Sequence, residues 1–236
     1  MIRTFLKAEW RKLAMANYEI DAKILEPYLP YKTEIDLWEN KCYVSLVGFM
    51  FEETSVLGIK VPFHTNFEEV NLRFYVRFNE NGNWKRGVVF MKEIVPRSAI
   101  TWVANTIYGE NYECMPMDHI HEIDGNSLQT TYRWKKQHWN SLTVITSKEP
   151  YDIAEGSEEE FITEHYWGYA KKIGNRTLEY GVEHPRWQVY KTKSYSIDVD
   201  FGKIYGPDFG FLNQQKPSSV FLAEGSEIEV KRGVEL

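Results

Sequence analysis

The chain has few of the residues that cross-link small folds or bind metal ions. Its 236 residues include only two cysteines, Cys42 and Cys114, and no C-x-x-C pair. This excludes a disulfide framework and leaves a zinc site without support. Cys42 stands within an apolar strand pattern, where a buried, inert thiol is expected. A chain of this length can bury a core large enough to fold without such cross-links.

The sequence also lacks long apolar runs and an excess of positive charge. No run of about 18 apolar residues occurs, so no membrane-spanning helix is predicted. Residues 1–13 are amphipathic and do not resemble a secretory signal, so a cytoplasmic location is expected. The formal net charge is -6, which argues against nucleic acid as a partner because phosphate contacts need a basic face.

Aromatic side chains, in contrast, are plentiful and make up 15% of the residues. In strand-rich proteins such rings line cavities well, although they also fill cores. No repeat, low-complexity linker or shift in composition divides the chain, so residues 1–236 are predicted to form one domain. A small molecule is the partner that these features favour, and the sequence does not define an oligomeric state.

Segments rich in β-formers and bounded by turn residues predict a fold of the α+β class that is mainly antiparallel β. Turn signals at Asn81-Gly82 and Asp124-Gly125, and a turn over residues 39–41, predict hairpins. The predicted strands cover residues 34–38, 42–51, 66–79, 84–95, 112–123, 127–136, 139–147, 177–183 and 187–200.

Three helices are predicted beside these strands. Asp21 can cap a short helix over residues 22–28 that stops at Pro30. A longer helix over residues 158–173 begins with Ser157 and Glu160 in a capping box. Its apolar stripe comprises Phe161, Ile162, His165, Tyr166 and Tyr169. The remaining helix, over 98–107, rests on the helical spacing of Ile100, Val103, Ala104 and Ile107.

One predicted strand carries a row of polar side chains. Alternation places Glu69, Asn71 and Arg73 on one face, flanked by Phe67 and Tyr75. The opposite face is apolar apart from Glu68, and it is expected to pack on a core. The polar face therefore meets either water or a wet cavity. In a cavity, the carboxylate, amide and guanidinium form a fixed set that can orient a small anionic or carbonyl ligand.

The pattern Phe67-x-Glu69-x-Asn71-x-Arg73, followed by Tyr75-Val76, resembles the most characteristic motif of the YqjF-like family of uncharacterised proteins. That family belongs to the acetoacetate decarboxylase-like superfamily. The resemblance implies a curved antiparallel sheet that closes into a cone or barrel around a central cavity, with a helix packed outside. Further matches cover nearly the whole chain in the expected order: Leu25-x-x-Tyr28-Leu29-Pro30, Tyr108 and Tyr112 with Met115, Phe161-x-Thr163-Glu164-x-Tyr166, and His184-Pro185-x-Trp187.

The resemblance does not extend to the lysines of the decarboxylase. Acetoacetate decarboxylase forms a Schiff base on a lysine that a cationic neighbour activates. By resemblance a lysine pair should follow Tyr108-Gly109, where this chain has residues 110–113 without a lysine. The adjacent pairs Lys135-Lys136 and Lys171-Lys172 fall near the ends of predicted elements, where exposed lysines are expected. Neither Schiff-base chemistry nor a cofactor is therefore predicted.

The residues predicted to bind a ligand combine the polar row with three residues suggested by the family pattern. His184 is either a general acid or base or a structural residue of the turn before Pro185. His119 and His121 share a strand face, but nothing nearby completes a ligand set, so no metal site is predicted. The predicted ligand-binding residues are Glu69, Asn71, Arg73, Tyr112, His184 and Trp187.

Two classes of function remain open from the sequence. The first is a non-catalytic or regulatory domain that binds a small carbonyl or carboxylate ligand in an aromatic-lined cavity. The second is an enzyme that acts on a small oxoacid or lactone without a catalytic lysine. An interaction or structural role is a third option, and a large exposed apolar patch would favour it.

Overall fold

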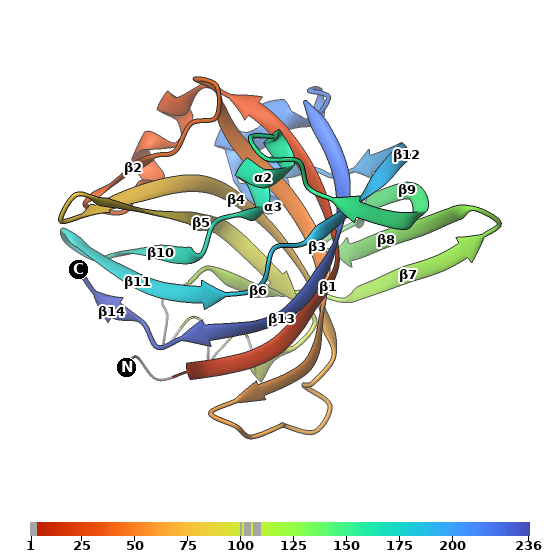
Figure 1. Cartoon of the computed structure of the whole chain (residues 1–236), viewed down its shortest axis with the longest axis horizontal. Helices are drawn as coiled ribbons and strands as arrows, with labels where there is room; N and C mark the ends of the chain where they lie inside the picture. The colour runs from red at the N-terminus through yellow and green to blue at the C-terminus, as the bar shows by residue number, and fades with distance from the viewer. Residues whose placement is uncertain (1–3, 100, 102–104, 106–109) are drawn as a thin grey trace.

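The computed structural model describes residues 4–99, 101, 105 and 110–236. In this part of the chain, strands dominate and form one 14-stranded sheet (Figure 1). The strands are β1 (Thr4–Ile20), β2 (Thr33–Ile35), β3 (Cys42–Val56), β4 (Phe67–Glu80), β5 (Asn83–Val95), β6 (Tyr112–Cys114), β7 (Met117–Asp124), β8 (Ser127–Lys135), β9 (Trp139–Asp152), β10 (Trp167–Lys172), β11 (Arg176–Glu183), β12 (Gln188–Asp198), β13 (Ser219–Lys231) and β14 (Val234–Glu235). The helical elements are η1 (Ala22–Ile24), η2 (Glu26–Tyr28), α2 (Glu158–Thr163), α3 (Phe201–Tyr205) and η3 (Pro207–Asn213).

Seven strands close into a ring. They follow the order β11, β10, β5, β4, β3, β1 and β13, and β13 pairs again with β11 at Val182↔Val230 and Glu183↔Glu229. Among the described pairings, only β5 with β10 and β5 with β6 are parallel. The predicted fold class, a mainly antiparallel sheet that curves and closes on itself, is therefore confirmed.

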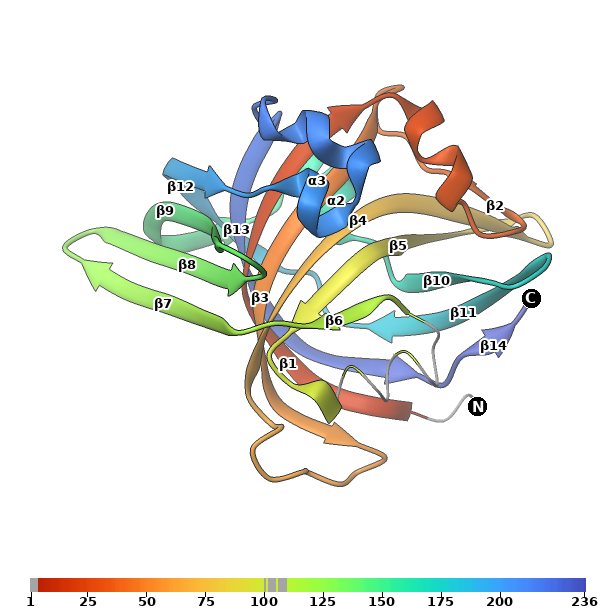
Figure 2. The ribbon, with the colours of Figure 1, turned by 180° about the vertical axis from the view of Figure 1, so that it is seen from behind.

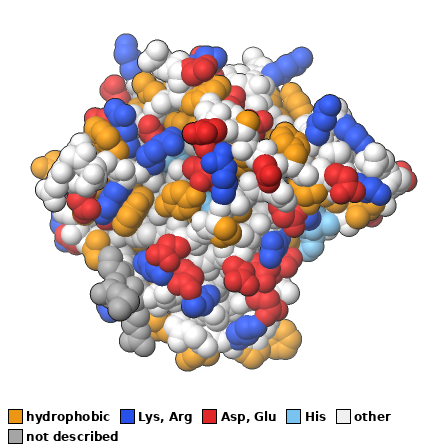
Figure 3. All heavy atoms as spheres, viewed as in Figure 1, with side chains coloured by type: hydrophobic (Ala, Val, Ile, Leu, Met, Phe, Trp, Pro, Cys, Tyr) orange, Lys and Arg blue, Asp and Glu red, His pale blue; other side chains and the backbone are white. Residues whose placement is uncertain are grey.

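The rest of the sheet continues from β13 through β12, β9, β8 and β7, and projects from the ring as an arm (Figure 1, Figure 2). The short helices gather at one end of the ring (Figure 2). On the face seen in Figure 3, Lys and Arg are interspersed with Asp and Glu, so its described side chains form no continuous basic surface. None of the described helices is long and apolar enough to cross a membrane.

Both faces of strand β4 carry buried apolar side chains, and the polar row lies on one of these faces. Leu72 and Phe74 belong to a core cluster that also contains Phe201 of α3 and Phe209 of η3. Tyr75, on the alternate face, belongs to a second cluster. The predicted alternation therefore holds, because one face of β4 packs against the outer helices while the other faces the interior of the ring.

The hairpin predicted at Asn81-Gly82 joins β4 to β5. Both turn residues have positive φ, 53° and 92°, and the turn leaves Glu80 opposite Asn83. Such a two-residue turn matches the twist of the paired strands. Farther along, the pairing shifts by one residue between Leu72 and Arg73, which is a β-bulge in β5. This shift decides which side chains of β5 face the interior.

The helix predicted over residues 158–173 is wrong beyond Thr163. Its start is confirmed, since the Ser157 hydroxyl accepts a hydrogen bond from the Glu160 backbone N–H at 3.2 Å. The helix then ends, and residues 167–172 form β10 between β5 and β11. A stretch rich in aromatics with Gly168 at its centre satisfies helical spacing, but it also suits a strand buried on both sides.

Other differences concern the predicted strand over residues 34–38, two strands that were not predicted, and the predicted helix over 98–107. The strand expected over 34–38 is the short β2, which pairs with β4 rather than with β3, so the hairpin predicted there reduces to a single bridge between Trp38 and Lys41. The long strands β1 and β13 were not predicted. The residues that carry the predicted helix over 98–107, Ile100, Val103, Ala104 and Ile107, lie outside the described part of the chain.

Candidate functional site

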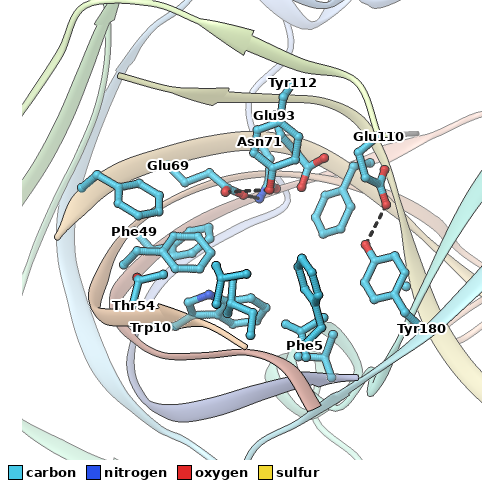
Figure 4. A pocket seen from close by; sticks show the side chains of 18 of the residues that line it. Phe5, Trp10, Phe49, Thr54, Glu69, Asn71, Glu93, Glu110, Tyr112 and Tyr180 are labelled. Atoms are coloured by element: carbon cyan, nitrogen blue, oxygen red, sulfur yellow. Dashed lines mark hydrogen bonds between the residues drawn. The ribbon is translucent and has the colours of Figure 1, made fainter. Parts of the chain in front are cut away.

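A cavity of about 320 Å³ lies inside the ring, and its wall is mainly apolar and aromatic (Figure 4). All seven ring strands contribute side chains to it, because alternate residues of a strand point to the same face. The aromatic part of the wall comprises Phe5, Trp10, Phe49, Phe51, Phe67, Phe90 and Trp167. Cavities of this size and composition commonly hold small molecules.

The polar row of β4 lines this cavity. Glu69, Asn71 and Arg73 are 2%, 1% and 7% exposed, respectively. The strand register places Glu93 of β5 opposite Asn71, and Tyr112 of β6 beside Glu93. The Asn71 side-chain amide donates a hydrogen bond to Glu69 Oε1 at 3.0 Å, and the Tyr112 hydroxyl donates to Glu69 Oε2 at 3.1 Å. These contacts fix the Glu69 carboxyl on the cavity wall.

A second carboxyl and hydroxyl pair stands across the cavity. The Tyr180 hydroxyl of β11 donates a hydrogen bond to Glu110 Oε1 at 2.7 Å (Figure 4). Gly168 of β10 makes room for this ring, since a side chain at that position would come within 2.2 Å of Tyr180. The glycine is therefore required by the close approach of the tyrosine.

Burial raises the pKa of all three carboxyl groups of the cavity, Glu69, Glu93 and Glu110. For Glu93 the nearby carboxyl groups of Glu110 and Glu69 raise the pKa further. For Glu69, the hydrogen bonds from Asn71 and Tyr112 and the charge of Arg73 oppose burial without reversing the shift. A carboxyl group with a raised pKa keeps its proton to a higher pH than a free carboxyl group, and while protonated it can donate a hydrogen bond.

Arg73 forms the cationic end of the row. Its Nη2 donates to the backbone carbonyl of Ile162 in α2 at 3.3 Å, and its guanidinium lies over the Tyr75 ring at 5.7 Å. Among the described residues it has no ion pair, and its Nε has no hydrogen-bond partner. A buried arginine is costly without an anionic partner, and no carboxylate of the described residues forms an ion pair with Arg73.

His165, which follows α2, also lines the cavity. Its Nε2 lies 3.2 Å from Asp36 Oδ2, and the same oxygen accepts a hydrogen bond from Arg86 Nε at 2.6 Å. Burial lowers the pKa of His165 to about 4, so the imidazole is neutral at physiological pH. Its Nδ1 has no partner.

Unsatisfied polar atoms are concentrated in residues that line the cavity, although the atoms themselves are buried. Ten buried side-chain nitrogen or oxygen atoms of the described residues have no hydrogen-bond partner, and six belong to residues that line the cavity. Each such atom costs roughly 1–3 kcal/mol if it stays unpaired. The six atoms are Trp10 Nε1, Thr54 Oγ1, Asn71 Oδ1, Arg73 Nε, Glu93 Oε2 and His165 Nδ1.

The structure brings four of the six predicted residues together and leaves two apart. Glu69, Asn71, Arg73 and Tyr112 line the cavity, whereas His184 and Trp187 do not. Those two rings stack on each other at 4.3 Å, and Trp187 packs edge-on against Trp10 at 6.3 Å. His184 and Trp187 therefore pack outside the residues that line the cavity. A role in ligand binding stays a prediction for all six residues.

The lining residues that were not predicted include four with titratable side chains, Glu93, Glu110, His165 and Tyr180. His165 was assigned to an apolar helical stripe, which hid its polar contact with Asp36. Glu93 depends on the β-bulge, since regular pairing from the Asn81-Gly82 turn would place Lys92 opposite Asn71 instead. Glu110 belongs to residues 110–113, which were considered only because they contain no lysine. The sequence pattern there does not indicate that the Glu110 side chain points inward.

No lysine lines the cavity among the described residues, and the positions outside them carry none either. Lys92 points away, where its Nζ donates to Glu113 Oε2 at 2.7 Å and to the carbonyl of Ile204 at 2.6 Å. Lys171 and Lys172 end strand β10 rather than a helix.

The fold is similar to that of acetoacetate decarboxylase-like proteins. One solved acetoacetate decarboxylase is 14% identical, with a TM-score of 0.68 over 99% of this chain and 90% of that chain. The acetoacetate decarboxylase of Legionella pneumophila is 12% identical, with a TM-score of 0.66 over 98% and 87%. The enduracididine biosynthesis enzyme MppR, complexed with pyruvate, is 10% identical, with a TM-score of 0.65 over 100% and 91%.

The chain belongs to the DUF2071 family of uncharacterized conserved proteins, whose model matches residues 7–227. No protein with a curated description matches it in sequence. The predicted membership of an uncharacterised family with an acetoacetate decarboxylase-like fold is therefore confirmed, while the narrower name YqjF-like stays a resemblance.

Proposed function

We propose that this protein binds a small carbonyl or carboxylate ligand in the ring cavity without forming a Schiff base. The observation that carries the proposal is the buried Arg73 on a mainly apolar cavity wall, with no ion pair among the described residues. A buried guanidinium is costly without an anionic or hydrogen-bonding partner, and a carboxylate or carbonyl group in the cavity would supply one.

The chemistry of the wall selects the ligand. Arg73 offers a cationic donor, and the Glu93 carboxyl, whose pKa burial raises, offers a neutral donor when it is protonated, while apolar rings cover most of the remaining surface. A carboxylate or carbonyl oxygen accepts from both kinds of donor. MppR, which has a similar fold, is seen with pyruvate. Pyruvate is therefore a suitable first probe for this chain.

Replacing Arg73 tests the proposal. Arg73→Met should weaken pyruvate binding by about 10- to 100-fold, since a hydrogen bond to a charged group contributes roughly 1.5–3 kcal/mol. Binding is measured by isothermal titration calorimetry, and circular dichroism checks that the variant is folded.

Arg77→Met is the matched control. Arg77 stands four residues along the same strand, and its side chain is 41% exposed in an ion pair with Glu34. It should bind pyruvate like the wild type. If Arg73→Met binds pyruvate as tightly as the wild type, the proposal is contradicted. A covalent adduct trapped by borohydride in the presence of pyruvate would also contradict it.

An enzyme acting on a small oxoacid or lactone, without a catalytic lysine, is the second candidate. The raised pKa values of the cavity carboxyl groups favour it, because a protonated carboxyl in an apolar pocket is suited to general acid catalysis. Turnover of a panel of oxoacids and lactones, followed by NMR, distinguishes this candidate from binding alone.

A further inference from the structure

The cavity has a polar side and an apolar side (Figure 4). Strands β4, β5 and β6 supply Glu69, Glu93 and Tyr112 to the polar side. Phe5 and Trp10 of β1 lie across the cavity from them (Figure 4). Both rings are only partly buried, so they present surface to the cavity. A ligand that contacts both sides therefore needs a hydrogen-bonding group and a hydrocarbon part.

Four strands contribute a continuous layer of aliphatic side chains to the wall. Leu6 of β1 lies opposite Val56 of β3 on one side and opposite Val230 of β13 on the other. Val230 in turn lies opposite Val182 of β11. Cross-strand partners share a face of the sheet, and all four side chains line the cavity. This aliphatic layer offers no side-chain hydrogen bond to a ligand or to water.

The cavity approaches the surface beside the loop between β3 and β4. Ile59 and Val61 of this loop line the cavity and are nevertheless 67% and 46% exposed. The loop lies at the end of the ring opposite to the short helices (Figure 1, Figure 2). Arg73, in contrast, binds the carbonyl of Ile162 in helix α2. The cavity thus has an apolar rim at one end and its cationic group toward the other.

The cavity is also larger than a three-carbon acid needs. Its volume of about 320 Å³ is within the range of roughly 300–1,000 Å³ that pockets for drug-sized ligands span. Phe67, which begins β4 beside the loop, lies roughly 20 Å along the strand from Arg73 at about 3.3 Å per residue. Pyruvate at the polar side leaves the aliphatic layer uncovered. Apolar cavities hold water poorly and bind hydrocarbon instead.

We propose that the ligand of the ring cavity is an amphipathic acid with a hydrocarbon chain. Its carbonyl or carboxylate head lies at the polar side, and its chain packs on the aliphatic layer and on Phe5 and Trp10, toward the rim at Ile59 and Val61. This inference rests on the proposed function, because that function supplies the binding site of the head. It adds that the natural ligand belongs to the longer-chain acids rather than to acids of the size of pyruvate.

A homologous series of acids tests the proposal. The full-length protein is titrated by calorimetry with pyruvate, 2-oxobutanoate, 2-oxohexanoate and 2-oxooctanoate, which share one head and differ in the chain. The Kd should fall about fourfold for each added methylene that the wall buries. A Kd that stays constant or rises along the series would overturn the proposal, and this result requires no variant.

A variant that fills the aliphatic layer distinguishes the cavity from the protein surface as the place of the chain. Val230→Trp puts a large ring into the layer and should weaken 2-oxooctanoate binding by about 10-fold or more. Val234→Trp is the matched control, since Val234 of β14 is 41% exposed and outside the cavity wall. It should reproduce the wild-type series. With circular dichroism showing a folded Val230→Trp protein, an unchanged Kd for 2-oxooctanoate would refute the assignment of the chain to this layer.

The same titrations distinguish the two proposals. Pyruvate binding that depends on Arg73, without any gain along the series, would overturn the amphipathic ligand alone. Absence of binding for every acid would overturn the proposed function and the inference that rests on it. Affinity that rises with chain length in the wild type, and that Arg73→Met lowers for every acid, supports both.

Discussion

At the scale of single residues, the most unusual feature is a set of carboxyl groups whose pKa burial raises. A group whose pKa is higher in the folded than in the unfolded state stabilises the fold fully only below its unfolded pKa. For Glu69, Glu93 and Glu110 the shift is upward, so their contribution is present at acid pH and is lost as pH rises through the folded pKa, which is about 7 for Glu69 and Glu110.

Glu93→Gln tests this account of the carboxyl groups. Glutamine is neutral at every pH, so the free energy of unfolding of the variant should fall less than that of the wild type between pH 5 and pH 8. The difference should be roughly 1.4 kcal/mol for each unit of pKa shift that is removed. Urea unfolding at the two pH values measures the difference. The same change on the surface, Glu34→Gln, is the control. Parallel pH dependences for wild type and Glu93→Gln would contradict the raised pKa.

Residue positions were predictable where a short local rule governs them. Alternation along one strand was sufficient to place Glu69, Asn71 and Arg73 on a common face. The position of His165 could not be predicted in this way, because its partner Asp36 is 129 residues distant in the chain. A buried hydrogen bond between segments so far apart leaves no periodic signal.

At the scale of elements, the bulge in β5 has the largest effect on the site. Regular pairing would place a lysine opposite Asn71, inside the cavity. The extra residue turns Lys92 outward to Glu113 and brings Glu93 inward. Bulges are common beside functional sites because they redirect a side chain without changing the strand order. No composition rule reveals such a shift, although the Asn81-Gly82 turn that begins the register is evident from the sequence.

Gly168 provides a test at this scale. Gly168→Ala places a methyl group within 2.2 Å of the Tyr180 ring and should destabilise the protein by about 1–3 kcal/mol, with displacement of Tyr180 from Glu110. Gly181→Ala is the matched control in the adjoining strand, since a methyl group there lies 3.5 Å from its nearest neighbour, the flexible Lys231 side chain. Thermal unfolding of both variants gives the comparison, and equal losses would refute the packing argument.

At the scale of the whole molecule, the residue pattern indicated the fold class, whereas closure of the sheet was expected only from the family resemblance. Hairpin turns and alternating segments indicated an antiparallel sheet. The ring, however, is completed by β1 and β13, which pair along most of their length although more than 200 residues of chain separate Thr4 from its partner Lys231. Charged residues such as Glu9 and Arg11 interrupt the apolar pattern of β1, so local reasoning did not identify a strand there.

The central claim is that the ring cavity holds a small carbonyl or carboxylate molecule against Arg73. A crystal structure of the protein grown with pyruvate tests it most directly. The account predicts density for pyruvate inside the cavity, with an oxygen within hydrogen-bond distance of the Arg73 guanidinium and the apolar end against the aromatic wall. A cavity that contains only water, or pyruvate bound solely at the protein surface, would contradict the claim.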